Sequence, residues 1–91
     1  MPVPPAELTA EFTVETSPEG EKSPRDQIEA GREVAAASGL ARETGPESTA
    51  LSGSREEVLD ALPRVIGASL DAGARAVHAR VETTTEARRK P

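Results

Sequence analysis

The stretch RETGPESTALSG, residues 42–53, contains the first two side chains that could bind a ligand. Glu43 and Thr49 stand on either side of the Gly45-Pro46 dipeptide, which is typical of a turn. In a hairpin, a carboxylate and a hydroxyl would lie near one strand end. A few convergent polar groups of this kind give a small cleft specificity for a polar heterocycle. The alternative interpretation is structural, because Glu43 could be solvated and Thr49 simply suits a strand.

Two further segments alternate between apolar and polar side chains: residues 8–15 throughout, and residues 74–82 with Val77, Ala79 and Val81 set against His78, Arg80 and Glu82. Their polar sides carry Glu11 and Thr13 in the first segment and His78 and Arg80 in the second. One interpretation makes Glu11 a ligand acceptor with Thr13 beside it. The other is a cross-strand ion pair, worth about 0.2–1 kcal/mol, or a polar contact between subunits. The predicted ligand-binding residues are Glu11, Thr13, Glu43 and Thr49.

The residue types favour binding over catalysis. The chain has no cysteine and a single histidine, which excludes thiolate nucleophiles, disulfides and histidine metal clusters. The sequence provides His78 with neither a nucleophile nor an orienting partner, so an interface or sheet role is the better interpretation. We therefore predict no enzyme activity, no catalytic residue, no metal and no cofactor. A hydrolase built on paired carboxylates is the weakest alternative, because nothing places them around a cleft.

The net charge of −5 argues against nonspecific nucleic-acid binding, which requires lysines and arginines to neutralise phosphates. No apolar run approaches the roughly 20 residues that a membrane helix needs. The start, MPVPPAEL, also lacks the basic and then apolar layout of a signal peptide. These observations predict a cytoplasmic protein without nucleic-acid or membrane partners.

Two helices are expected to position the candidate residues. Residues 23–39 have a capping serine, a proline at the first helical position and a terminal glycine. The interior Gly31 costs about 1 kcal/mol relative to alanine, and a close approach of this helix to the sheet would explain its presence. Residues 54–73 carry a capping box and a stripe of apolar residues widened by Leu59 and Leu70. Pro63 lies inside this helix and is expected to kink it.

With strands over 8–15 and 74–82 and a hairpin over 40–52, the predicted order is β-α-β-β-α-β. This order predicts an α+β, ferredoxin-like domain, a four-stranded antiparallel sheet with two helices on one face. The domain is expected over residues 8–83, between a disordered arm over 1–7 and a polar tail over 84–91. The sheet face with Glu11, Thr13, His78 and Arg80 is then uncovered. Since the core is thin and rich in alanine, we also expect a homo-oligomer.

An ordered set of short motifs resembles the family of small thiamine-binding proteins. The motifs are AEFTVE, then SGL, RETGPESTALSG, EEVLDAL and DAGARAV. They span roughly residues 8 to 90. The resemblance implies a ferredoxin-like subunit that assembles into dimers or tetramers, binds thiamine or its hydroxymethylpyrimidine part, and has no catalytic activity.

The leading expectation is thus a non-enzymatic protein that binds a small heterocyclic ligand of the thiamine type as a homo-oligomer. The alternative, from another class, is a regulatory or structural interaction module whose sheet docks a different protein and binds no vitamin.

Overall fold

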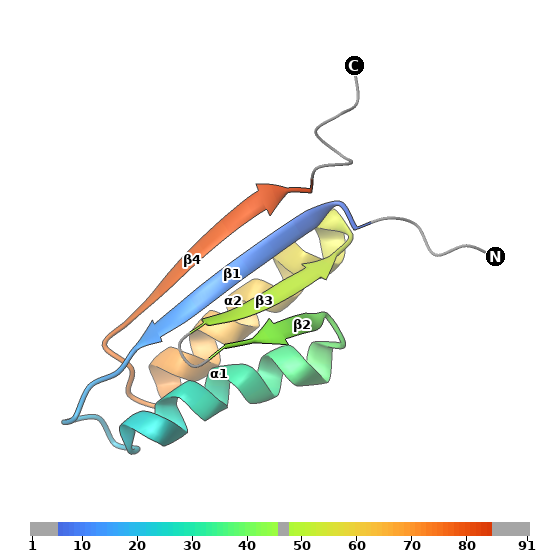
Figure 1. Ribbon diagram of the computed structural model, residues 1–91. Helices are drawn as coiled ribbons and strands as arrows, with labels where there is room; N and C mark the ends of the chain where they lie inside the picture. The colour runs from blue at the N-terminus through green and yellow to red at the C-terminus, as the bar shows by residue number, and fades with distance from the viewer. Residues whose placement is uncertain (1–5, 46–47, 85–91) are drawn as a thin grey trace.

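The computed structural model describes residues 6–45 and 48–84, and six elements follow one another in this part of the chain (Figure 1). They are β1 (Leu8–Glu15), α1 (Pro24–Ser38), β2 (Ala41–Thr44), β3 (Ser48–Gly53), α2 (Arg55–Asp71) and β4 (Ala76–Thr83). The strands form one antiparallel sheet in the order β2-β3-β1-β4. Both helices lie on the same side of it (Figure 1). The predicted ferredoxin-like α+β fold is confirmed.

The core lies between the sheet and the two helices. Alternation along β1 sends Leu8, Ala10 and Phe12 toward the helices, and all three are buried. The single aromatic residue, Phe12, is only 2% exposed. The apolar residues that complete this core are Ala35, Leu40, Leu51, Val58, Ala61, Leu62 and Val65. Four of these seven are alanine or valine, so the core is small, as the composition predicted.

The ends of both helices are fixed by the residues that the sequence marked. The Ser23 hydroxyl accepts the backbone N–H of Asp26 at 3.2 Å, and Gly39 ends α1 with a left-handed φ of 78°. At the start of α2, Ser54 and Glu57 form the predicted capping box. The helix α2 continues through Pro63 to Asp71.

Gly31 allows a close approach of the two helices. A Cβ atom at this position would come within 3.0 Å of the Ser69 hydroxyl oxygen on α2, closer than real Cβ atoms come to other atoms. The next atoms belong to Phe12 of β1, at 3.5 Å, and to Val65 of α2, at 3.7 Å. The glycine therefore serves the contact between helices more than the expected contact with the sheet. Ser69 itself is buried, and its hydroxyl donates to the Val65 carbonyl at 3.1 Å.

Gln27 ties the loop between β1 and α1 to the body of the domain. It is fully buried, and its side-chain oxygen accepts the backbone N–H of Ser17 at 2.8 Å. Its amide nitrogen donates to the carbonyls of Ser17 and Lys22, both at 2.8 Å. All three contacts are to backbone, so this buried glutamine supplies hydrogen-bond partners to part-buried backbone groups of the loop.

Three apolar side chains at the margin of the domain are more exposed than the sequence pattern predicts. Leu59 and Leu70, which widened the predicted apolar stripe of α2, remain 45% and 47% exposed. Val81 on β4 is 41% exposed, although alternation sends it to the side of the helices. Val81 is exposed because two helices do not cover the full width of four strands and β4 lies at the border of the sheet, while Leu59 and Leu70 lie on α2 outside its buried side.

The expected arm and tail lie mainly outside the described residues, which omit 1–5 and 85–91. The inner ends of both segments are joined to the sheet. The Thr84 hydroxyl donates to the Ala6 carbonyl at 2.7 Å, and the Thr84 backbone N–H donates to the Glu7 carbonyl at 3.1 Å. Pro46 and Glu47 of the predicted hairpin turn also lie outside the described residues.

Candidate functional site

The side of the sheet opposite the helices is not covered by the described part of the chain, and we call it the open face. It is formed by alternate residues of the three strands β1, β3 and β4, and all of them are half-buried or exposed. Its residues are Thr9, Glu11, Thr13, Glu15, Ser48, Ala50, Ser52, Ala76, His78, Arg80 and Glu82. Four of them are serines or threonines, and only two are apolar, both alanines, so the open face suits a polar partner or ligand.

Strand register arranges the open face in rows. Glu11 lies between Ala50 of β3 and Arg80 of β4, and Thr13 lies between Ser48 and His78. The predicted ligand residues Glu11 and Thr13 are therefore neighbours on one strand, both pointing to the same side. This placement agrees with the sequence analysis, and ligand contact by these residues stays a prediction.

The other two predicted residues are placed differently. Glu43 is paired by register with Ala50, so its backbone continues the row of Glu11 toward the β2 border. Thr49 is paired with Phe12 and is only 3% exposed, on the side of the helices. A ligand on the open face cannot reach the Thr49 hydroxyl, because the thickness of the sheet separates them. The structure brings Glu11 and Thr13 together and separates Thr49 from both.

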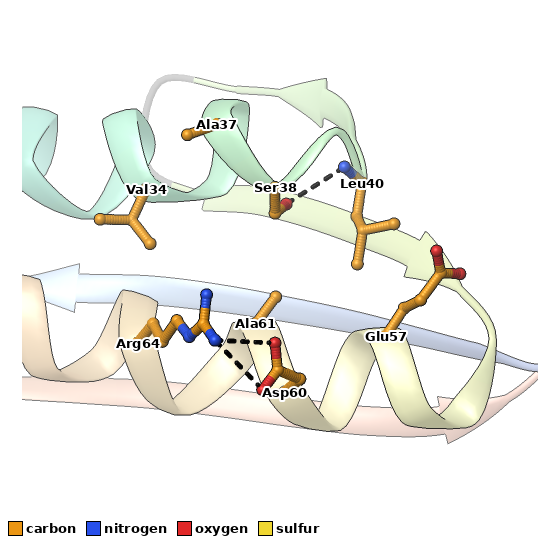
Figure 2. Close-up of a pocket in the computed structure, with 8 residues that line it drawn as sticks. All are labelled: Val34, Ala37, Ser38, Leu40, Glu57, Asp60, Ala61 and Arg64. Carbon is orange, nitrogen blue, oxygen red and sulfur yellow. Dashed lines mark hydrogen bonds and ion pairs between the residues drawn. The ribbon is translucent and has the colours of Figure 1, made fainter.

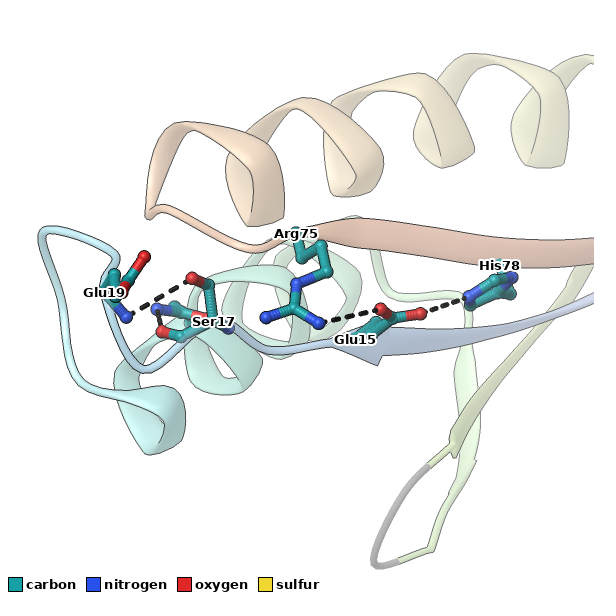
Figure 3. Close-up of polar contacts among 6 residues, drawn as sticks. Glu15, Ser17, Glu19, Arg75 and His78 are labelled. Atoms are coloured by element: carbon teal, nitrogen blue, oxygen red, sulfur yellow. Dashed lines mark hydrogen bonds and ion pairs between the residues drawn. The ribbon is translucent and has the colours of Figure 1, made fainter.

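Ion pairs on the open face do not use Glu11. Nε2 of His78 lies 3.0 Å from Oε1 of Glu15, and Nη1 of Arg75 lies 3.8 Å from Oε2 of the same carboxylate (Figure 3). Arg80, which is directly opposite Glu11, instead pairs with Glu82 of its own strand at 3.1 Å. The cross-strand pair that the sequence offered for Glu11 is thus replaced by pairs of Glu15 with His78 and Arg75 and of Arg80 with Glu82, and the Glu11 carboxylate remains available at the centre of the open face.

His78 has an orienting partner that the sequence did not reveal. The partner is Glu15, the last residue of β1, which is 63 positions away along the chain. Both side chains are well exposed, at 67% for His78 and 44% for Glu15. An exposed pair of this kind is worth little to stability, and it gives the histidine a fixed position at one end of the open face.

A cleft lies between the C-terminal half of α1 and the first half of α2 (Figure 2). This helix cleft has a volume of about 310 Å³ and an apolar floor. Its lining residues are Val34, Ala37, Ser38, Leu40, Glu57, Asp60, Ala61 and Arg64. None of the residues predicted to bind a ligand lines it. The sequence analysis assigned Glu57 only to the helix cap. The i,i+4 spacing of Asp60 and Arg64, which favours an ion pair on a helix, is the one further signal in the sequence for residues of this cleft.

The polar groups of the helix cleft are already partnered. Arg64 forms an ion pair with Asp60 at 3.2 Å (Figure 2), and the Ser38 hydroxyl donates to the Ala35 carbonyl at 2.6 Å. The Glu57 carboxylate accepts the Ser54 backbone N–H, and this hydrogen bond, more than any other contact, lowers the pKa of Glu57. The cleft therefore offers fewer unpaired polar groups to a ligand than the open face does.

Within residues 6–45 and 48–84, no three side chains of the metal-binding types come together. No helix in the same part of the chain is both long and apolar enough to cross a membrane.

Comparison with known proteins gives the fold and no function. No family model matches the chain, and no curated protein matches it. A solved structure of a domain of unknown function, DUF77, from Bacillus cereus is similar, with a TM-score of 0.68 and 28% identity over 87% of this chain and 76% of that one. A hypothetical protein from Methanocaldococcus jannascii has a TM-score of 0.64 and 20% identity over 86% of this chain and 78% of that one.

These findings correct the resemblance to thiamine-binding proteins, which is wrong. The similar structures are a domain of unknown function and a hypothetical protein, and neither a family model nor a curated protein supports the assignment. The structure also shows why the motifs misled. Phe12 is a core residue, Gly39 and Gly73 end the helices with positive φ angles, and Ser54 and Glu57 cap α2. The motifs thus mark elements of the fold and carry no information about a ligand.

Proposed function

We propose that the protein is a non-enzymatic binding protein that holds a small nitrogen heterocycle, cationic or neutral, on the open face of its sheet. The single observation that supports this proposal is the surrounding of the Glu11 carboxylate on the open face. Its carboxylate is exposed, the arginine opposite pairs elsewhere, and Thr13 adds a half-buried hydroxyl two residues along. A carboxylate provides charge for a cation, and the hydroxyl can donate to or accept from a ring substituent.

The proposal includes a homo-oligomer. A sheet face exposes one side of any bound molecule, whereas small-molecule sites bury 70–90% of the ligand surface. A second copy that covers the open face would complete the enclosure, and the thin core is consistent with a protein that gains stability through association. The acidic net charge of −5 also favours a cation over an anion.

Binding can be tested by calorimetry with two related probes, thiamine as the cation and its hydroxymethylpyrimidine part as the neutral ring. We expect Glu11→Gln to weaken binding of the cationic probe by about tenfold and to change binding of the neutral probe less, because the substitution removes charge and preserves size. Thr13→Val should weaken the binding of both probes. The matched control is Glu33→Gln on the exposed side of α1, which should leave the affinity for both probes unchanged.

A thermal-shift screen is the preceding step. A probe present at 100 times its dissociation constant adds about 2.7 kcal/mol to the free energy of unfolding. The proposal fails if neither probe stabilises the protein, or if the affinity of Glu11→Gln for the cationic probe equals that of the wild type.

The second candidate function is a regulatory or structural interaction module whose sheet docks a different protein. The exposed apolar side chains Leu59 and Leu70 of α2 and Val81 of β4 are the observation that favours a protein partner, because apolar groups left exposed can be buried against another protein. Absence of any thermal shift with the two probes, together with retained folding, would favour this candidate over the first.

A further inference from the structure

The outer border of the sheet is an unprotected strand edge. β4 pairs with β1 over all eight of its residues without a register shift, and β1 is its only neighbour within the described sheet (Figure 1). It contains no proline, no glycine and no bulge, which are the devices that proteins use to prevent pairing at a sheet edge. Only its charged side chains oppose association with another strand.

The direction of the β4 backbone groups follows from two hydrogen bonds at the ends of the strand. The carbonyls of Glu7 and Glu15 both accept N–H groups from the β4 segment, those of Thr84 and Arg75. In an antiparallel pair, hydrogen-bonded positions alternate. The odd-numbered residues of β1 therefore turn their N–H and C=O groups toward β4. The register pairs each of them with an even-numbered residue of β4, so within the strand the even-numbered residues turn their N–H and C=O groups toward β1. The odd-numbered residues, from Val77 to Thr83, turn theirs away from the sheet and leave them free to pair with another strand.

The apolar groups beside this edge lie on the side of the helices. Val81 is 41% exposed, and Leu59 on the first half of α2 is 45% exposed. Both lie at the same end of the sheet, because α2 begins directly after Gly53, which is aligned through Leu8 with the end of β4. The cleft residues Glu57 and Ala61 mark the side of α2 that faces α1, and Leu59 lies on the other side, toward β4.

A second copy of β4 can pair with this edge in only a few symmetric registers, each defined by the residue on the two-fold axis. Centring on Arg80 or Glu82 places like charges directly opposite each other, and centring on Ala79 places His78 opposite Arg80. Centring on Val81 places Arg80 of each copy opposite Glu82 of the other, on both sides of the axis. It also joins the outward N–H and C=O groups of the two Val81 residues. Opposite charges at facing positions are stabilising, and like charges are destabilising.

We propose that two copies of this chain associate through β4, antiparallel and centred on Val81, to form a continuous eight-stranded sheet. Within one subunit Arg80 pairs with Glu82 of its own strand at 3.1 Å. In the dimer, Arg80 of each copy can pair with Glu82 of the other copy across the axis. The two Val81 side chains pack against each other on the side of the helices. The pairing does not depend on the ligand proposed above. Its hydrogen bonds form at the β4 edge, while the side chains of Arg80 and Glu82 also belong to the β4 border of the open face.

Charge reversal tests the register. Arg80→Glu places four carboxylates around the axis, and Glu82→Arg places four guanidinium groups there, so each variant alone should associate at least tenfold more weakly than the wild type at low salt. When the two variants are mixed, every facing pair is complementary, and sedimentation should show a heterodimer at wild-type affinity. The matched control is the exposed α2 pair Asp60 and Arg64, where Asp60→Arg and Arg64→Glu should leave association unchanged.

A backbone variant separates the edge from the open face. In Val81→Pro the lost N–H points away from β1, so the sheet of the subunit keeps its hydrogen bonds while the edge loses its central one. Val81→Ala shortens the side chain and retains the N–H. We expect Val81→Pro to abolish the edge contact and Val81→Ala to weaken it less, with circular dichroism showing that both remain folded.

Two results would overturn the pairing. One is a mixture of the two charge variants that associates no better than either alone. The other is a folded Val81→Pro protein that keeps the wild-type association state, which would assign the contact to another surface, such as the open face. A wild-type protein that is monomeric at micromolar concentration and low salt would also exclude it. Loss of ligand binding in Glu11→Gln without a change in sedimentation would leave the edge pairing standing, so the two proposals fail separately.

Discussion

The close contact between Gly31 and Ser69 makes a quantitative prediction about stability. Gly31→Ala gains about 1 kcal/mol of helix propensity. Its Cβ atom, however, would come within 3.0 Å of the Ser69 hydroxyl oxygen. The hydroxyl must then rotate and lose its bond to the Val65 carbonyl, or the helices must move apart. Overpacking costs about 1–3 kcal/mol, and a buried unpaired hydroxyl costs a similar amount. We expect a net destabilisation of about 1–2 kcal/mol.

Removal of the hydroxyl should reverse the sign of this effect. In the Ser69→Ala background the nearest remaining atoms belong to Phe12 and Val65, at 3.5 and 3.7 Å, which are ordinary contact distances. Gly31→Ala should then stabilise by about 1 kcal/mol, from propensity alone. The coupling between the two substitutions is therefore about 2–3 kcal/mol, well above the few tenths expected for independent sites.

Urea unfolding of the four proteins of this cycle, followed by circular dichroism at one fixed protein concentration, measures the coupling. The fixed concentration matters because association adds to apparent stability. Gly67→Ala on α2 is the matched control, because nothing lies within 4 Å of the Cβ atom that it adds. It should stabilise by about 1 kcal/mol. The reasoning is refuted if Gly31→Ala stabilises as Gly67→Ala does, or if the cycle is additive within about 0.5 kcal/mol.

Two further predictions concern the first loop and the second helix cap. Gln27→Leu should lower the free energy of unfolding by about 2–4 kcal/mol, since it leaves three part-buried backbone groups of the first loop without their side-chain partner. Urea unfolding measures this change, and a loss below about 1 kcal/mol would contradict the prediction. The hydrogen bond from the Ser54 backbone N–H lowers the pKa of Glu57 below its usual value of 4.5. A lowered folded pKa gives stability that is present above the unfolded pKa and is lost as pH falls through the folded pKa. The urea midpoint should thus decrease below about pH 4.5, and Glu57→Gln should remove part of that decrease; an identical pH profile in both proteins would exclude the effect.

The order of elements could be predicted from sequence because each signal is local. Alternation over residues 8–15 and the capping serines of both helices act within a few residues of the chain, and the structure confirms each of them. Alternation over residues 8–15 also puts Phe12 on the apolar side of its strand, and the structure buries it there, at 2% exposure. The same signals produced the mistaken family resemblance, because turn glycines and caps recur wherever this fold recurs.

The candidate site could be predicted only in part. Alternation correctly placed Glu11 and Thr13 on the uncovered side of the sheet. Alternation does not give the register between β3 and β1, and this register places Thr49 opposite Phe12, where it is buried. A shift of one residue would exchange the two faces of β3, and the register is set by contacts between distant parts of the chain. The pairing of His78 with Glu15 was missed for the same reason, since 63 positions separate them.

The sequence by itself determined which segments become helices and strands, where both helices begin and end, and which side of β1 is apolar. These properties arise from interactions between residues no more than about four positions apart. Only the tertiary structure decided that Gly31 meets Ser69, that Glu11 is left without the arginine opposite it, and that β4 keeps one edge unpaired. Each of these depends on distances between residues far apart in the chain, which the packing of two helices on four strands sets and local pattern does not contain.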